Sequence, residues 1–246
     1  MSLSRVLSAE VRKTITLPAS WVAAAVTLLG SLLITLLNGY AVHADPAGSA
    51  FIAPLDIAFA AAPLGTVGAS VLGVIVFSSE YTGERQITTT LAAVPNRVLL
   101  LAAKAIVVVL FVVVVAAVTM PVTIGAARLL VGGAVSVPTA VIQCLGAALY
   151  WLLSGLIALA ITVFARNGVV PLVVLIVNGS LVSFSLLLSK VSPVGFWLPD
   201  MAGRRLLDGA HTVDGGLGAV PGALVMVAWT VLLLAAATAV LHRRDA

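Results

Sequence analysis

The residues that could carry out metal or thiol chemistry are few and widely separated. The three histidines, His43, His211 and His242, lie far apart and form no His-x-x-x-His pair of the kind that binds a metal from one helix. The single cysteine, Cys144, lies in an apolar stretch, so the chain can form neither an internal disulfide nor a cysteine cluster for a metal. We therefore expect no metal site.

A nucleotide-hydrolysing site is not found in the sequence either. A P-loop needs Gly-x-x-x-x-Gly-Lys-Ser/Thr, because its backbone amides cradle the phosphates and its lysine reaches them. The only lysines are Lys13, Lys104 and Lys190, and none of them follows such a run. We expect the chain not to be an enzyme and to bind no cofactor of its own.

The densest group of polar and charged side chains occupies residues 79–98. Within it, Ile87, Leu91 and Val94 recur at spacings of four and three residues, and Pro95 ends the pattern. This spacing predicts a short amphipathic helix with hydroxyls and charges on its other face. A simple connection between two helices needs only about two to eight residues. The length and the apolar stripe therefore indicate a role beyond connection.

The elements that position this segment are predicted to be membrane helices. Of the 246 residues, 61% are hydrophobic and 9% are charged, whereas soluble domains carry about 25% charged residues. Six continuous apolar stretches each approach or exceed the roughly 20 residues that cross a bilayer as a helix, and their lack of alternation excludes a barrel. The predicted spans are 19–37, 57–77, 99–124, 141–164, 169–188 and 221–241.

The positive residues predict the orientation of these spans. Of the 13 lysines and arginines, nine fall on the side of the N-terminus, and four, Arg128, Lys190, Arg204 and Arg205, fall on the other. Since positive residues accumulate in cytoplasmic loops, both termini are predicted to be cytoplasmic. We expect an all-α integral membrane protein with six transmembrane helices and one domain, 1–246, in the plasma membrane of a bacterium. The net charge of +4 then reflects the loops and not a nucleic-acid partner.

Residues 1–18 are predicted to form an amphipathic helix at the membrane surface. Arg5 and Arg12 lie opposite its apolar face, Lys13 lies at the edge, and Pro18 ends the helix. Glu10 falls within the apolar arc, where it either pairs locally with Arg12, Lys13 or Arg97 or ties the helix to the next cytoplasmic loop. The predicted apolar face consists of Leu3, Val6, Leu7, Val11 and Ile15.

Polar residues inside the spans are rare. Asn178 in the fifth span and Gln143 in the fourth either hold helices together or line a substrate path. Small residues at four-residue spacing, Ala69 with Gly73 and Ser154 with Ala158, permit close helix contacts. No acidic or basic residue lies well away from the ends of a span, which counts against a pump driven by protons or sodium.

The polar segment resembles the loop between the second and third helices of ABC-2-type transporter permeases. The resemblance rests on Glu80-Tyr81-x-Gly83, the Thr89-Thr90-Leu91 run, Pro95, Arg97 and Lys104, and on Glu10-Val11-Arg12-Lys13, which is similar to the elbow helix of that family. It implies a coupling helix that docks on a separate ATPase, which would hold ATP and Mg²⁺. The residues it assigns to coupling are Glu80, Tyr81, Gly83, Glu84, Arg85, Thr89, Thr90, Leu91, Pro95 and Arg97, and those it assigns to the interfacial helix are Glu10, Arg12 and Lys13.

Two functions of different classes are open from the sequence. The first is the permease subunit of an ATP-driven exporter, working with an ATPase subunit and with a second permease copy or a paralogue. The second is an ATPase-independent membrane scaffold or secondary carrier. The coupling-type segment favours the first. An apolar path without charges favours an amphiphilic substrate.

Overall fold

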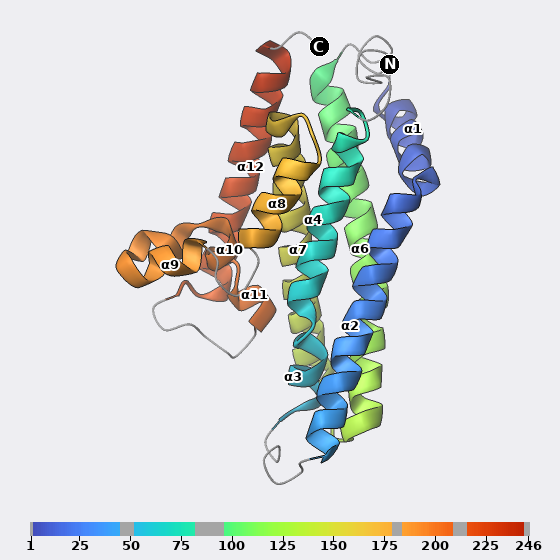
Figure 1. Cartoon of the computed structure of the whole chain (residues 1–246), viewed down its shortest axis with the longest axis vertical. Helices are drawn as coiled ribbons and strands as arrows, with labels where there is room; N and C mark the ends of the chain where they lie inside the picture. Colours follow the sequence, from blue (N-terminus) through green and yellow to red (C-terminus); the bar gives the residue numbers. More distant parts are fainter. Residues whose placement is uncertain (1, 45–51, 82–95, 179–183, 209–215, 244–246) are drawn as a thin grey trace.

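The computed structural model describes residues 2–44, 52–81, 96–178, 184–208 and 216–243, and every regular element in these ranges is a helix (Figure 1). This confirms the predicted all-α class. The helices are α1 (Leu3–Thr16), α2 (Pro18–Ala44), α3 (Pro54–Phe59), α4 (Ala62–Ser78), α6 (Arg97–Val131), α7 (Val137–Ala165), α8 (Val169–Asn178), α9 (Phe184–Val191), the 3₁₀ helix η1 (Pro193–Trp197), α10 (Pro199–Ala202), α11 (Arg205–Asp208) and α12 (Ala219–Arg243).

Five helical units in the described residues are long and apolar enough to cross a membrane: α2, α3 with α4, α6, α7 and α12. They match five of the six predicted spans, and their length and composition are those of a multi-pass membrane protein. Each helix extends beyond its predicted span, as when α2 continues to Ala44, because a helix can continue past the hydrocarbon core into the interface.

The predicted span 169–188 corresponds to two shorter helices, α8 and α9, and residues 179–183 between them lie outside the described part. α8 follows the bundle, whereas α9 lies across its long axis (Figure 1). Among the described residues, neither helix has the length of a span.

Proline and asparagine define several helix starts. Pro18 is the first residue of α2, so α1 and α2 are separate helices, as predicted. The side chain of Asn96 caps α6 by accepting a hydrogen bond from the backbone N–H of Leu99 at 3.1 Å.

One end of the bundle, which we call the α1 end, holds α1, the C-terminal end of α4, the start of α6 and the end of α12 (Figure 1).

The core of the bundle depends on small residues between α4 and α7. A Cβ on Gly73 would lie 2.1 Å from the carbonyl oxygen of Gly155, and one on Gly155 would lie 3.0 Å from that of Ala69. Ala69, Gly73 and Ala158 therefore lie at a close helix contact, as predicted, with Gly155 in place of Ser154. Trp151 strengthens the contact by donating from Nε1 to the carbonyl oxygen of Ala62 at 2.9 Å.

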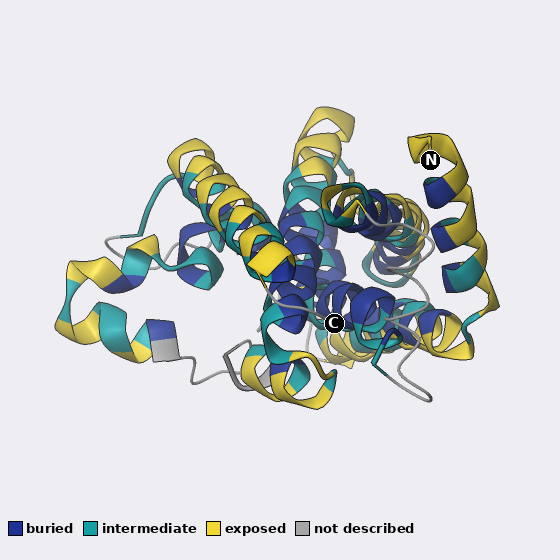
Figure 2. Cartoon of the chain, turned by 90° about the horizontal axis from the view of Figure 1, so that it is seen from above, coloured by how far each residue is buried: buried dark blue, intermediate teal, exposed yellow. Residues whose placement is uncertain are grey.

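Apolar side chains also cover the outside of the bundle. Trp21, Leu29 and Leu33 on α2 are each more than half exposed, and α12 shows a similar face at Leu224 and Val231. Buried residues lie along the centre and exposed ones along the outer faces (Figure 2). An apolar outer face of this kind is typical of a helix that contacts lipid.

Candidate functional site

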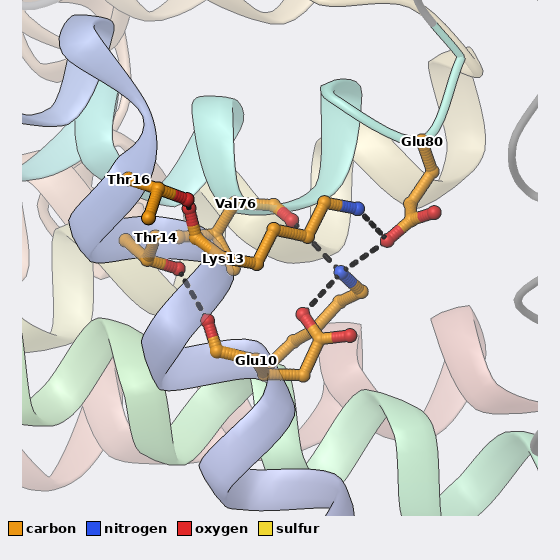
Figure 3. A network of polar contacts seen from close by, with 7 residues as sticks. Glu10, Lys13, Thr14, Thr16, Val76 and Glu80 are labelled. Atoms are coloured by element: carbon orange, nitrogen blue, oxygen red, sulfur yellow. Dashed lines mark hydrogen bonds and ion pairs between the residues drawn. The ribbon is translucent and has the colours of Figure 1, made fainter.

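Glu10, Lys13 and Glu80 gather in an ionic network at the α1 end (Figure 3), and Lys104 is the centre of this network. Lys104 lies on α6, about two turns from the start of the helix, and its side chain is completely buried. Its Nζ donates to Glu10 Oε2 at 2.7 Å, to Glu80 Oε1 at 2.7 Å and to the carbonyl oxygen of Val76 at 3.0 Å. An ammonium group has three protons to donate, and all three find an acceptor here.

Glu80 joins this lysine to α1. Its Oε1 also accepts from Lys13 Nζ at 2.6 Å, so one carboxylate oxygen binds two ammonium groups. Glu80 is completely buried, Glu10 is nearly so, and the side chain of Lys13 is 29% exposed. The network thus pairs two acidic with two basic side chains, and it is most open to solvent at Lys13.

The network unites three elements that are distant in the sequence. Glu10 and Lys13 belong to α1, and Lys104 belongs to α6. Glu80 is the second residue after the end of α4. Thr14 Oγ1 donates to the carbonyl oxygen of Glu10 at 2.9 Å, and Val6 packs one turn away against Leu100 and Ala103 of α6. α1 is therefore fixed by both apolar packing and charge.

α1 packs against the bundle through most of its predicted apolar face, since Val6 is buried and Leu7 and Val11 pack against the core. Glu10 and Thr14 are buried with them, whereas Leu3 and Ile15 are 42% and 47% exposed. The ion pair with Lys104 compensates the charge of Glu10, because an uncompensated buried charge is costly. The exposed apolar side chains then face the surroundings that the membrane interface provides.

The network lowers the pKa of the Glu80 carboxyl group. Burial alone would raise the pKa of this carboxyl, but the nearby charges and hydrogen bonds of Lys104 and Lys13 outweigh burial, and the net effect lowers the pKa below its ordinary value. The ring of Phe77 adds a further favourable contact, with its centroid 5.8 Å from Lys104 Nζ. Glu80 therefore remains ionised at neutral pH.

Arg97 makes a second connection at the same end of the bundle. Its Nη1 donates to the carbonyl oxygen of Leu241 and, at 3.4 Å, to that of His242. These carbonyls belong to the last turn of α12, where a cation is favourable because the helix leaves its final carbonyls without helical partners. The start of α6 is thus tied to the end of α12.

The two alternatives for Glu10 can now be distinguished. Its ion pair is with Lys104, and the prediction of a local pair with Arg12, Lys13 or Arg97 is wrong for the pairs found in the described residues. Arg12 points away from the bundle as an exposed residue. The other alternative holds: through Lys104, Glu10 is tied to Glu80, at the start of the polar segment 79–98.

The predicted coupling residues divide into two groups. Glu80, Tyr81 and Arg97 border the segment, and Tyr81 packs its ring against Phe77 with the centroids 5.7 Å apart. The other predicted residues lie outside the described part of the chain: Gly83, Glu84, Arg85, Thr89, Thr90, Leu91 and Pro95.

The residues predicted for a substrate path are not part of the network. Gln143 lies near the start of α7, at the opposite end of the bundle, and its buried Oε1 has no hydrogen-bond partner among the described residues. Asn178 is the last residue of α8, and its side chain lies outside the described part.

Lys104 is the functional residue whose importance sequence reasoning underestimated. The orientation argument counts only its charge, whereas the structure buries it within a long apolar helix. The signal in the sequence is a single lysine that follows six apolar residues and precedes a long apolar run. A cation there needs carboxylates from other elements.

The comparisons with known proteins do not add a family to this description. The sequence matches no protein-family model, and a search of curated proteins also finds no match. The functional argument therefore depends on the geometry of the chain itself.

Proposed function

We propose that this chain is the membrane-spanning permease subunit of an ATP-driven exporter, with ATP and Mg²⁺ bound by a separate ATPase subunit. The observation that carries the proposal is the buried network of Glu10, Lys13, Glu80 and Lys104. Its residue Glu80 directly precedes, with Tyr81, the sequence segment 82–95. The resemblance of that segment to the coupling loop of ABC-2-type permeases supplies the partner.

Both ends of the segment are fixed to membrane helices. Glu80, on its N-terminal side, is held by α1 and α6, and Arg97, on its C-terminal side, is held by the last turn of α12. A displacement of the segment by a partner would therefore act on three helices together. Coupling of this kind requires a contiguous physical connection between the driving partner and the moving helices.

The proposal has further parts that concern the assembly. The chain works in a bacterial plasma membrane as a six-span subunit with both termini cytoplasmic, next to a second permease copy or a paralogue. Its substrate is amphiphilic, because the helices offer apolar side chains with few polar ones, such as Gln143, to a molecule between them.

Purification of the tagged chain in mild detergent tests the proposal. We expect a stoichiometric subunit with a Walker site to purify with it, detected by mass spectrometry, and the complex to hydrolyse ATP. A wild-type complex without such a subunit, under conditions that keep the helices folded, would favour the scaffold or carrier.

A substitution at Glu80 tests the role of the network in the same assay. Glu80→Gln should keep the ATPase bound but reduce hydrolysis or transport at least tenfold, because the neutral amide loses the ion pairs that fix the segment to Lys104 and Lys13. Arg12→Gln is the matched control, since it removes a charge from the exposed side of α1. Equal activity of the two variants would argue against a coupling role of the network.

A further inference from the structure

A hollow of about 330 Å³ lies between α6 and α7 at the end of the bundle opposite to α1. Its walls are formed mainly by apolar side chains, and Arg128 of α6 contributes the one charged group among the lining residues. On α7 the lining extends from Val137 to Leu145, which is roughly 12 Å along the helix at 1.5 Å per residue. The hollow is thus elongated, apolar and charged at one place.

Arg128 carries a positive charge that no described residue neutralises. The residue is exposed, and it forms no ion pair with any residue that the structure describes. None of the residues that line the hollow is acidic. A ligand with an anionic group is therefore complementary to it, whereas an ammonium group would meet only the guanidinium.

The position of Arg128 along α6 corresponds to a membrane boundary. It lies 24 residues after Lys104 on one continuous helix, which is roughly 36 Å at 1.5 Å per residue. The hydrocarbon core of a bilayer is about 30 Å thick. When Lys104 lies at one boundary, Arg128 therefore lies at the level of the lipid headgroups of the other.

We propose that this hollow binds a phospholipid with an anionic headgroup. The phosphate would accept paired hydrogen bonds from the guanidinium of Arg128, which suits bidentate recognition. The beginning of one acyl chain would lie along Val141 and Leu145 of α7, in contact with Ile124 of α6. The site is independent of the proposed transport function, because it requires only that the helices span a bilayer.

Cys144 makes the proposal directly measurable. It lines the hollow and is the only cysteine in the chain, so alkylation by N-ethylmaleimide changes the intact mass at one site. We would measure the alkylation rate of the purified full chain in a neutral detergent while adding dioctanoyl phosphatidylglycerol, dioctanoyl phosphatidylcholine or inorganic phosphate. The anionic lipid should slow alkylation at least threefold, and the other two should not.

Two variants separate the headgroup contact from the chain contact. Arg128→Gln should raise the lipid concentration needed for protection at least tenfold, whereas Lys190→Gln, which removes an exposed positive charge elsewhere, should leave it unchanged. Ala140→Phe should fill part of the hollow and reduce the number of lipids retained in native mass spectrometry. Equal protection by phosphatidylcholine or by phosphate alone, or full protection in Arg128→Gln, would overturn the proposal.

Discussion

α6 carries a cation toward each of its ends, Lys104 and Arg128, and these two cations have opposite environments. Lys104 is completely buried and is neutralised by Glu10 and Glu80 from its own chain. Arg128 is exposed, and the described residues offer it no carboxylate. A cation with internal partners connects parts of the fold, whereas one without them is suited to an anion from outside. The same helix therefore has a structural junction at one end and a candidate binding site at the other.

The largest effect should come from removing the buried cation. Lys104→Met would leave Glu10 and Glu80 buried without their shared partner, at a cost of about 3–5 kcal/mol. We expect a large fall in the fraction of protein that remains monodisperse after heating in detergent. Lys190→Met, at an exposed lysine of α9, is the control that removes the same type of charge. Equal heat resistance of the two variants would show that the network does not hold the fold.

The two carboxylates of the network should differ in their importance. Glu80 binds two ammonium groups and is completely buried, whereas Glu10 binds one and lies at the edge. Glu80→Gln should therefore destabilise the protein by about 3 kcal/mol and Glu10→Gln by roughly half of that. The measurement is the same heating series. The reverse order would mean that Glu10 and not Glu80 is the principal partner of Lys104.

The lowered pKa of Glu80 predicts how the α1 end responds to acid. Because the pKa is lower in the folded protein than in the unfolded chain, the network contributes stability above the unfolded value of roughly 4.3. That contribution decreases as the pH falls through the folded pKa. Proteolytic cleavage within α1 should therefore accelerate in this acidic range for the wild type and change less in Glu80→Gln. A wild-type cleavage rate independent of pH over that range would contradict the assignment.

The smallest effect on the fold should come from the other end of α6. Arg128→Gln removes an exposed charge with no ion pair in the described residues, so its stability should lie within about 0.5 kcal/mol of the wild type. The heating series in lipid-free detergent measures this directly. A large loss would mean that Arg128 supports the fold and would remove the contrast between the two ends.

Much of the fold could be predicted from the sequence, because membrane helices appear in it as long continuous apolar runs. Continuous apolar runs predicted the five long helices, and the proline at position 18 predicted the boundary between α1 and α2. The small residues Ala69 and Gly73 predicted that a close helix contact is permitted there, but not that its partner is α7. These features follow from the local composition of each segment and from the chemistry of lipid.

The ionic network could be predicted only in part. Glu10, Lys13 and Glu80 were noticed because charged residues are rare in this chain, but the pairing of Glu10 with Lys104 joins positions 94 residues apart. Such a pair depends on how α1 packs on α6. The apolar periodicity of α1 predicts the packed face, which includes Val6, but it does not say which helix that face contacts.

The most direct test of the functional account is a crosslink between the polar segment and its partner in intact cells. A photo-crosslinking amino acid at Thr89 should form an adduct with a chain that contains a Walker site, and the same amino acid at Leu29, on the exposed face of α2, should not. Illumination that yields no ATPase adduct from Thr89 or its neighbours, in cells that contain the folded protein, would contradict the proposed coupling.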